Sequence, residues 1–82
     1  MNDEIHRGIA VFVRQTEAGS YGFIEPDDSN GSREQNVWFG EKAVQTRLPF
    51  EGEPVEYVLH GTPHPRFKTR NAASVWPKGD RR

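Results

Sequence analysis

The sequence predicts an all-β domain, a small closed barrel of five antiparallel strands. Gly and Pro make up fourteen of the 82 residues and interrupt the chain at short intervals. The runs between these breaks are rich in Val, Ile, Phe, Tyr and Trp, and none has the length or periodicity of a helix. Because five strands in about 70 residues cannot enclose a core as a flat open sheet, they are expected to close on themselves.

Five segments are expected to form the strands: residues 9–14, 20–25, 36–39, 54–60 and 70–76. Residues 26–35 (PDDSNGSREQ) form a turn cluster centred on Asn30-Gly31. Residues 61–67 carry Pro63 and Pro65 and must be a loop. Within residues 40–52, the stretch EKAV can form one helical turn. We expect one domain over residues 8–76, with a flexible N-terminus over 1–7 and a flexible basic tail over 77–82.

A five-stranded barrel of this size is expected to be of the OB type. The RNA recognition motif also places glycine-spaced aromatics on a strand. It needs two helices of about ten residues each, and this chain has no room for them.

Side-chain alternation along each strand separates a core from an outer aromatic face. The expected core is Ile24, Val37, Phe39, Val55, Tyr57, Leu59, Ala73 and Val75. The opposite side of the second and third strands then presents Tyr21, Phe23 and Trp38, and Gly22 lets neighbouring chain pack closely beneath. Three adjacent exposed rings indicate a binding surface, since strand rings stack on unpaired bases at about 1–3 kcal/mol each. The inverse parity, with these rings in the core, stays open as the alternative.

The stretch GSYGFIEPDD followed by NVWFG resembles the paired RNP1 and RNP2 strands of the cold-shock domain family. GIAVFV resembles the first strand of that family, GEPVEYVL the fourth and RNAASVWP the fifth, so the likeness covers residues 8–76. The resemblance implies that Tyr21 and Phe23 are the RNP1 aromatics, Trp38 the first RNP2 aromatic and Phe12 the exposed first-strand ring. In the family these rings stack on bases of single-stranded DNA or RNA, and the position of Asn36 contacts a base edge.

The chain departs from the family at RNP2, where Gly40 and Glu41 replace a histidine and an aromatic. The glycine removes a stacking group, and the glutamate repels phosphate. Residues 1–60 hold five Lys and Arg against eleven Asp and Glu, whereas residues 61–82 hold six against one. Arg66, Lys68 and Arg70 precede or begin the fifth strand, beside the RNP face in the family, and are expected near phosphates. Trp76 has no motif support and is expected to cap the barrel as a structural side chain.

The expected function is non-catalytic binding of single-stranded RNA or DNA. The expected site residues are Phe12, Tyr21, Phe23, Asn36, Trp38, Arg66, Lys68 and Arg70. The resemblance implies a role as an RNA chaperone or in transcription or translation control. The alternative is an OB-fold protein-interaction or self-association module with weakened nucleic-acid binding, motivated by the net charge of −1 and by Gly40 and Glu41. The chain is expected to be a monomer or a weak homodimer.

No enzyme, cofactor, metal site or small-molecule substrate is expected. The chain has no cysteine, which excludes disulfides and thiolate zinc sites. His60 and His64 flank Pro63 and lack a third ligand, and Asp27, Asp28 and Asn30 lack calcium-loop spacing. No apolar run approaches the roughly 20 residues of a membrane span, and the N-terminus does not resemble a signal peptide. A cytoplasmic location without a membrane partner is therefore expected.

Overall fold

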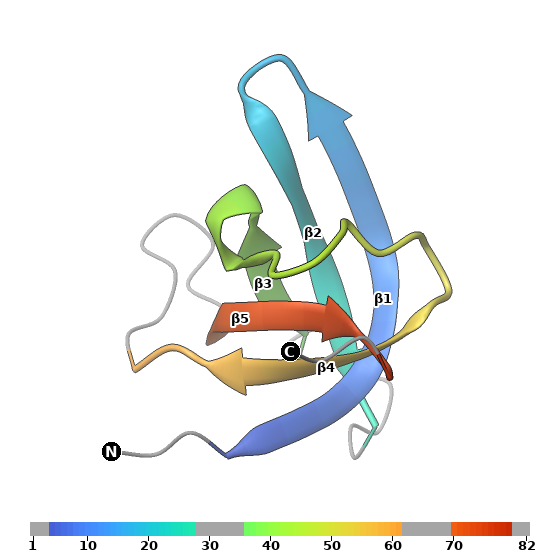
Figure 1. Cartoon of the computed structure of the whole chain (residues 1–82), viewed down its shortest axis with the longest axis vertical. Helices are drawn as coiled ribbons and strands as arrows, with labels where there is room; N and C mark the ends of the chain where they lie inside the picture. The colour runs from blue at the N-terminus through green and yellow to red at the C-terminus, as the bar shows by residue number, and fades with distance from the viewer. Residues whose placement is uncertain (1–3, 28–35, 62–69, 80–82) are drawn as a thin grey trace.

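The computed structural model of the chain describes residues 4–27, 36–61 and 70–79. Within these residues the chain forms β1 (Ile5–Thr16), β2 (Gly19–Pro26), β3 (Val37–Gly40), the 3₁₀ turn η2 (Glu41–Ala43), β4 (Pro54–Leu59) and β5 (Arg70–Pro77). The strands close into a barrel in the order β1-β2-β3-β5-β4 (Figure 1). The all-β five-stranded barrel is confirmed, and its strand order is consistent with an OB-like fold. The helical turn expected in EKAV is η2.

One of the five strand pairings is parallel, so the barrel is mostly antiparallel. Val37 and Trp38 of β3 lie opposite Arg70 and Asn71 of β5 in a parallel ladder. The other four pairings are antiparallel. Strand directions cannot alternate all the way around a ring with an odd number of members. A closed barrel of five strands therefore requires one parallel neighbour pair.

The strand β1 closes the barrel because it pairs on both sides. Its first half pairs with β4, from Ile5 opposite Val58 to Ile9 opposite Pro54, and from Gly8 onward it pairs with β2. The strand begins four residues before the expected start at position 9. Gly8 does not end it, because β1 crosses β2 closely there. A Cβ at Gly8 would lie 2.5 Å from the carbonyl oxygen of Glu25, so only glycine fits this crossing.

The barrel interior is apolar and closely follows the expected core. Ile24, Val37, Phe39 and Val75 are fully buried, and Leu59 packs against the cluster as a partly buried side chain. The complete set of buried hydrophobic side chains in this cluster is Ala10, Ile24, Val37, Phe39, Ala43, Val55, Tyr57, Ala72 and Val75. The inverse parity of β2 and β3 is thereby excluded, since it would have turned Ile24, Val37 and Phe39 towards water.

A bulge corrects one expected core position on β5. Val58 lies opposite Ser74 and Leu59 opposite Ala72, so Ala73 has no direct partner on β4. The extra residue reverses the alternation, and Ala72 instead of Ala73 points into the core. Ala73 is exposed. Sequence alternation cannot reveal a bulge between two alanines, because both residues suit either side.

The segment between η2 and β4 is held by an ion pair and covers one edge of β1. Arg47 binds both carboxylate oxygens of Glu53, and the Phe50 amide donates to the same carboxylate at 3.1 Å. The backbone of Ala10 exchanges hydrogen bonds with Gly52 and Glu53, at 2.6 and 3.0 Å. These bonds satisfy β1 just beyond Ile9, where its pairing with β4 ends. Residues 51–53 thus continue the barrel wall beside β1.

Trp76 is a structural side chain, as expected. It is 6% exposed, and its indole Nε1 donates to Oε1 of Glu56 at 2.9 Å. The other oxygen of Glu56 lies 3.6 Å from Nε of Arg7.

In the part of the chain that the structure describes, no helix is long and apolar enough to cross a bilayer.

Candidate functional site

A bulge in β1 turns Phe12 to the outside of the barrel. Ala10 lies opposite Ile24 and Phe12 opposite Phe23, so Val11 is the extra residue between them. Regular alternation would have put Ala10 and Phe12 on the same side. Ala10 is instead fully buried, while Phe12 is partly exposed and Val13 turns back towards the core. The bulge is therefore what brings Phe12 to the outer face.

Three rings and one amide form a row across four neighbouring strands. Phe12 lies opposite Phe23, Phe23 opposite Trp38, and Trp38 opposite Asn71. A second row, which crosses β2 two residues before Phe23, consists of Arg14, Tyr21 and Gly40. We call the four side chains Phe12, Tyr21, Phe23 and Trp38 the ring face. Neighbouring strands lie about 4.8 Å apart and alternate residues about 7 Å apart, so these rings cover a continuous surface.

Each side chain of the ring face is partly exposed. The rings shield one another, since the centroid of Phe12 lies 6.1 Å from that of Tyr21 and 6.1 Å from that of Phe23. Both pairs are tilted, at 48° and 50°. The guanidinium carbon of Arg14 lies 5.6 Å from the Phe12 centroid, which places a cation at the edge of the face. The result is an aromatic surface next to a positive charge.

Two glycines make room for rings on opposite sides of the sheet. A Cβ at Gly22 would lie 2.7 Å from Cζ of the buried Phe39 and would also clash with the carbonyl oxygen of Phe12. Gly22 therefore lets chain pack closely beneath the outer rings, as expected from the sequence. A Cβ at Gly40 would lie 2.6 Å from Cη2 of Trp38. The indole of Trp38 thus lies directly against Gly40, on the surface.

The remaining expected site residues divide into those that the structure places and those that it does not describe. Asn36 is partly buried just before β3, two residues from Trp38. Arg70 opens β5, is exposed, and lies opposite Val37, next to the third strand of the ring face. Arg66 and Lys68 lie outside the described residues. The structure therefore brings together Phe12, Tyr21, Phe23 and Trp38, and places Arg70 on the neighbouring strand opposite the buried Val37.

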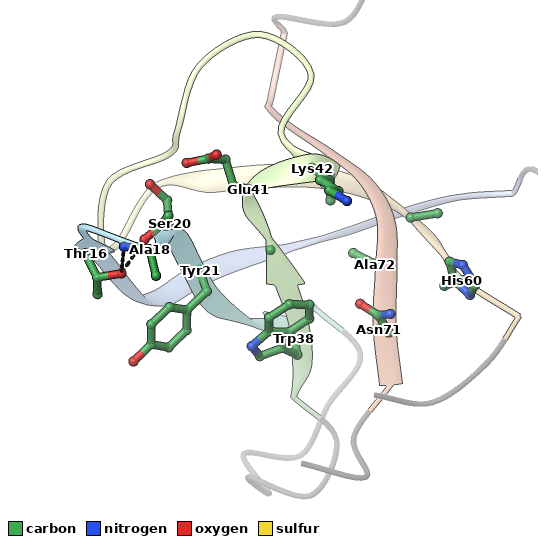
Figure 2. Close-up of a pocket in the computed structure, with 14 residues that line it drawn as sticks. Thr16, Ala18, Ser20, Tyr21, Trp38, Glu41, Lys42, His60, Asn71 and Ala72 are labelled. Carbon is green, nitrogen blue, oxygen red and sulfur yellow. Dashed lines mark hydrogen bonds between the residues drawn. The ribbon is translucent and has the colours of Figure 1, made fainter. Parts of the chain in front are cut away.

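A groove of about 870 Å³ continues the ring face towards the end of the β1–β2 hairpin. It passes Tyr21, Trp38 and Gly40, and is bordered by η2 and by the start of β5 (Figure 2). Figure 2 shows Tyr21 and Trp38 along one side, and Glu41 and Lys42 along the other. Gly40 and Glu41 both line the groove.

The hairpin end of the groove is a fixed turn. The hydroxyl of Thr16 donates to the Gly19 carbonyl at 2.8 Å and accepts from the Ala18 amide at 3.2 Å, as Figure 2 shows. Gly19 has φ +132°, a conformation that side-chain-bearing residues rarely adopt. The carboxylate of Glu41 lies over this glycine, with Oε1 3.5 Å from the position that a Cβ would take.

Sequence reasoning missed several polar side chains of the site. Arg14 lies beside Phe12 because of the β1 bulge, and Lys42, Ser20, His60 and Asn71 line the groove. A predicted pairing register between the first two strands could have identified Arg14, because Arg14 lies opposite Tyr21. The others come from four different segments and meet only when the barrel closes. Among the residues that the structure describes, no group of three His, Asp or Glu could hold a metal ion.

No protein-family model matches the chain, and no curated protein matches it either. The fold therefore stands as a five-stranded barrel consistent with an OB-like fold. Chemically, the site offers flat apolar rings for stacking, with the polar side chains of Arg14, Lys42 and Asn71 beside them.

Proposed function

We propose that this protein binds single-stranded RNA or DNA without catalysis, by stacking unpaired bases on the ring face. The observation that carries this proposal is the register of the outer rings. Phe12, Phe23 and Trp38 lie next to one another across three strands, and Tyr21 lies two residues before Phe23 on β2. Stacking on such rings is tolerant of sequence, because every base has a flat π-face. Each of the four side chains is partly exposed, so part of every ring reaches the surface of the barrel.

Cations at the border of the ring face supply the phosphate contacts. Arg14 lies beside Phe12, Lys42 lines the groove, and the exposed Arg70 starts β5. Arg66 and Lys68, which precede Arg70, extend this positive border in the proposal. Few phosphates are neutralised by so small a set, so stacking carries most of the affinity and the salt dependence is shallow.

The resemblance of the segments around Tyr21 and Trp38 to the RNP1 and RNP2 strands of the cold-shock domain supports the same function. In that reading the protein is a cytoplasmic, divergent member that acts as an RNA chaperone or in transcription or translation control. Gly40 and Glu41 shorten the stacking surface at one end, so the bound strand covers fewer bases than in the family.

The proposal is tested by Trp fluorescence during titration with oligo-dT and oligo-U at two salt concentrations. The chain has two tryptophans, and Trp76→Phe removes the buried one, whose indole lies outside the groove lining. The emission of Trp38 should then be quenched on binding, and the affinity should fall modestly as salt is raised. No quenching at low salt, with the fold intact by circular dichroism, contradicts the proposal.

A second candidate function is self-association or binding of a protein partner. It is favoured by three large apolar side chains that are well exposed: Ile9 at 41%, Val11 at 40% and Phe50 at 63%. Val11 is the bulged residue of β1, and the backbone of residues 52–53 bonds to Ala10, next to it. Light scattering distinguishes the two functions. A dimer that forms without quenching of Trp38 by any oligonucleotide favours this second function.

A further inference from the structure

The part of the groove beside Gly40 differs chemically from the ring face that borders it. The indole of Trp38 lies against Gly40, at 2.6 Å from the position that a Cβ would take there, and forms one wall of the groove. Tyr21, the register partner of Gly40, lines the same groove. A flat ligand that enters here is in reach of aromatic surface and of the polar side chains of η2 (Figure 2).

The polar wall is formed by Glu41 and Lys42 at the start and middle of η2. The Glu41 carboxylate is positioned over Gly19, with its two oxygens 3.5 and 3.8 Å from the position of a Cβ there. Neither this carboxylate nor the Lys42 ammonium is paired with any other residue in ranges 4–27, 36–61 and 70–79. Both groups are thus available to a ligand.

A carboxylate discriminates among bases because it only accepts hydrogen bonds, through two oxygens. Guanine presents two adjacent N–H donors, N1–H and the N2 amino group, which match both oxygens. Cytosine and adenine present one amino donor beside a ring-nitrogen acceptor. Uracil and thymine present a single N–H between two carbonyl oxygens, which a carboxylate approaches only against repulsion.

We propose that the groove beside Gly40 holds one unpaired base of the bound strand with its edge towards Glu41, and that guanine is preferred there over uracil or thymine. This inference rests on the proposed function and adds a base preference at a single position. Lys42, the neighbour of Glu41, supplies positive charge for the flanking phosphate and offsets the repulsion by the carboxylate. The preference arises from residues of this chain that stand where the cold-shock family has a histidine and an aromatic.

The test compares the affinities of a short fluorescein-labelled oligo-dT and of the same oligomer with one central dG, dC or dA, by fluorescence anisotropy. The wild-type protein should bind the dG oligomer about 5- to 100-fold more tightly than oligo-dT, as a two-bond base contact predicts. In Glu41→Gln this preference should vanish while oligo-dT binds at least as tightly. Glu17→Gln is the matched control, because it removes the same charge from an exposed residue of the β1–β2 turn outside the groove.

Three outcomes separate this inference from the function on which it rests. A dG preference that is lost in Glu41→Gln and kept in Glu17→Gln supports both. Binding of all oligomers with equal affinity, or a dG preference that survives in Glu41→Gln, overturns the base preference and leaves the proposed function standing. No binding of any oligomer at low salt overturns the proposed function and the base preference with it.

Discussion

Single residues shape the outer surface of this barrel by the space that they leave. Gly22 leaves room for the Phe39 ring on the core side of the sheet, and Gly40 leaves room for the Trp38 ring on the outer side. From the sequence, Gly40 counted only as a missing stacking group. In the structure it also determines where the neighbouring indole lies, because a side chain at position 40 and the present Trp38 conformation exclude each other. The replacement of one ring thus changes the position of another.

Gly40→Ala tests this role. The new Cβ would lie 2.6 Å from Cη2 of Trp38, so the indole must shift away from position 40. We expect the protein to fold with a change in unfolding free energy within about 0.5 kcal/mol, as for surface substitutions. In a Trp76→Phe background, the emission of Trp38 should shift to longer wavelength as the indole becomes more hydrated.

Gly61→Ala is the control for this change, because a Cβ there meets no atom within 4 Å. Its emission spectrum should match that of the parent. An unchanged Trp38 spectrum in Gly40→Ala would show that the indole does not rest on Gly40.

At the level of elements, two bulges decide which side chains face outward. The bulge at Val11 turns Phe12 to the ring face, and the bulge at Ala73 buries Ala72 in place of its neighbour. Alternation predicted the sides of β2 and β3 correctly, since neither strand is interrupted where the two pair. Alternation failed on β5, because two successive alanines do not indicate which of them faces the core. The outward position of Phe12 followed only from the resemblance to cold-shock domains.

The groove shows a second limit of sequence reasoning. Tyr21 and Trp38 were predicted as surface rings from their spacing alone. Lys42, His60 and Asn71 belong to three other elements or loops, and their meeting depends on the parallel contact of β3 with β5. The odd number of strands and the closure of the barrel require a parallel pair, but they do not determine that β3 and β5 form it.

The segment that joins η2 to β4 is an element whose stability depends on pH. The Glu53 side chain is 11% exposed and accepts hydrogen bonds from Arg47 and from the Phe50 amide. The hydrogen bond from Arg47 is the main reason that the pKa of the Glu53 carboxyl is lowered, against the opposing effect of burial. A carboxyl whose pKa is lower in the folded than in the unfolded chain stabilises the fold above its unfolded pKa. This stabilisation is lost as the pH falls through the lowered value.

Glu53→Gln should lower the free energy of unfolding by about 1–3 kcal/mol at neutral pH, because it removes the charge of a largely buried carboxylate that is hydrogen-bonded to the half-exposed Arg47. Urea unfolding measures the difference. The gap between wild type and variant should begin to close as the pH falls below the ordinary carboxyl pKa of about 4.3. It should be lost once the pH is also below the lowered pKa of the folded state, because Glu53 is then neutral in both states. Glu17→Gln, at an exposed position of the β1–β2 turn, should be neutral throughout. A gap that is independent of pH would contradict the assigned ion pair.

At the level of the whole molecule, the balance of charge and aromatic surface points to binding that depends on stacking. The net charge is −1, so the chain as a whole does not attract a polyanion. Arg14 lies beside Phe12, Lys42 lines the groove, and the exposed Arg70 begins β5. A closed barrel has few free strand edges, and its strands hold the outer rings in register. The ring face thus needs no large conformational change to form.

The most direct test of the central claim is the affinity of Phe23→Ala for oligo-dT, measured by fluorescence anisotropy. Phe23 is the middle ring of the row, opposite both Phe12 and Trp38. Its loss should cost about 1–3 kcal/mol of binding free energy. Phe50→Ala, which removes an exposed ring on the segment before β4, should leave the affinity unchanged. A folded Phe23→Ala variant that binds oligo-dT as tightly as the wild type would contradict stacking on the ring face.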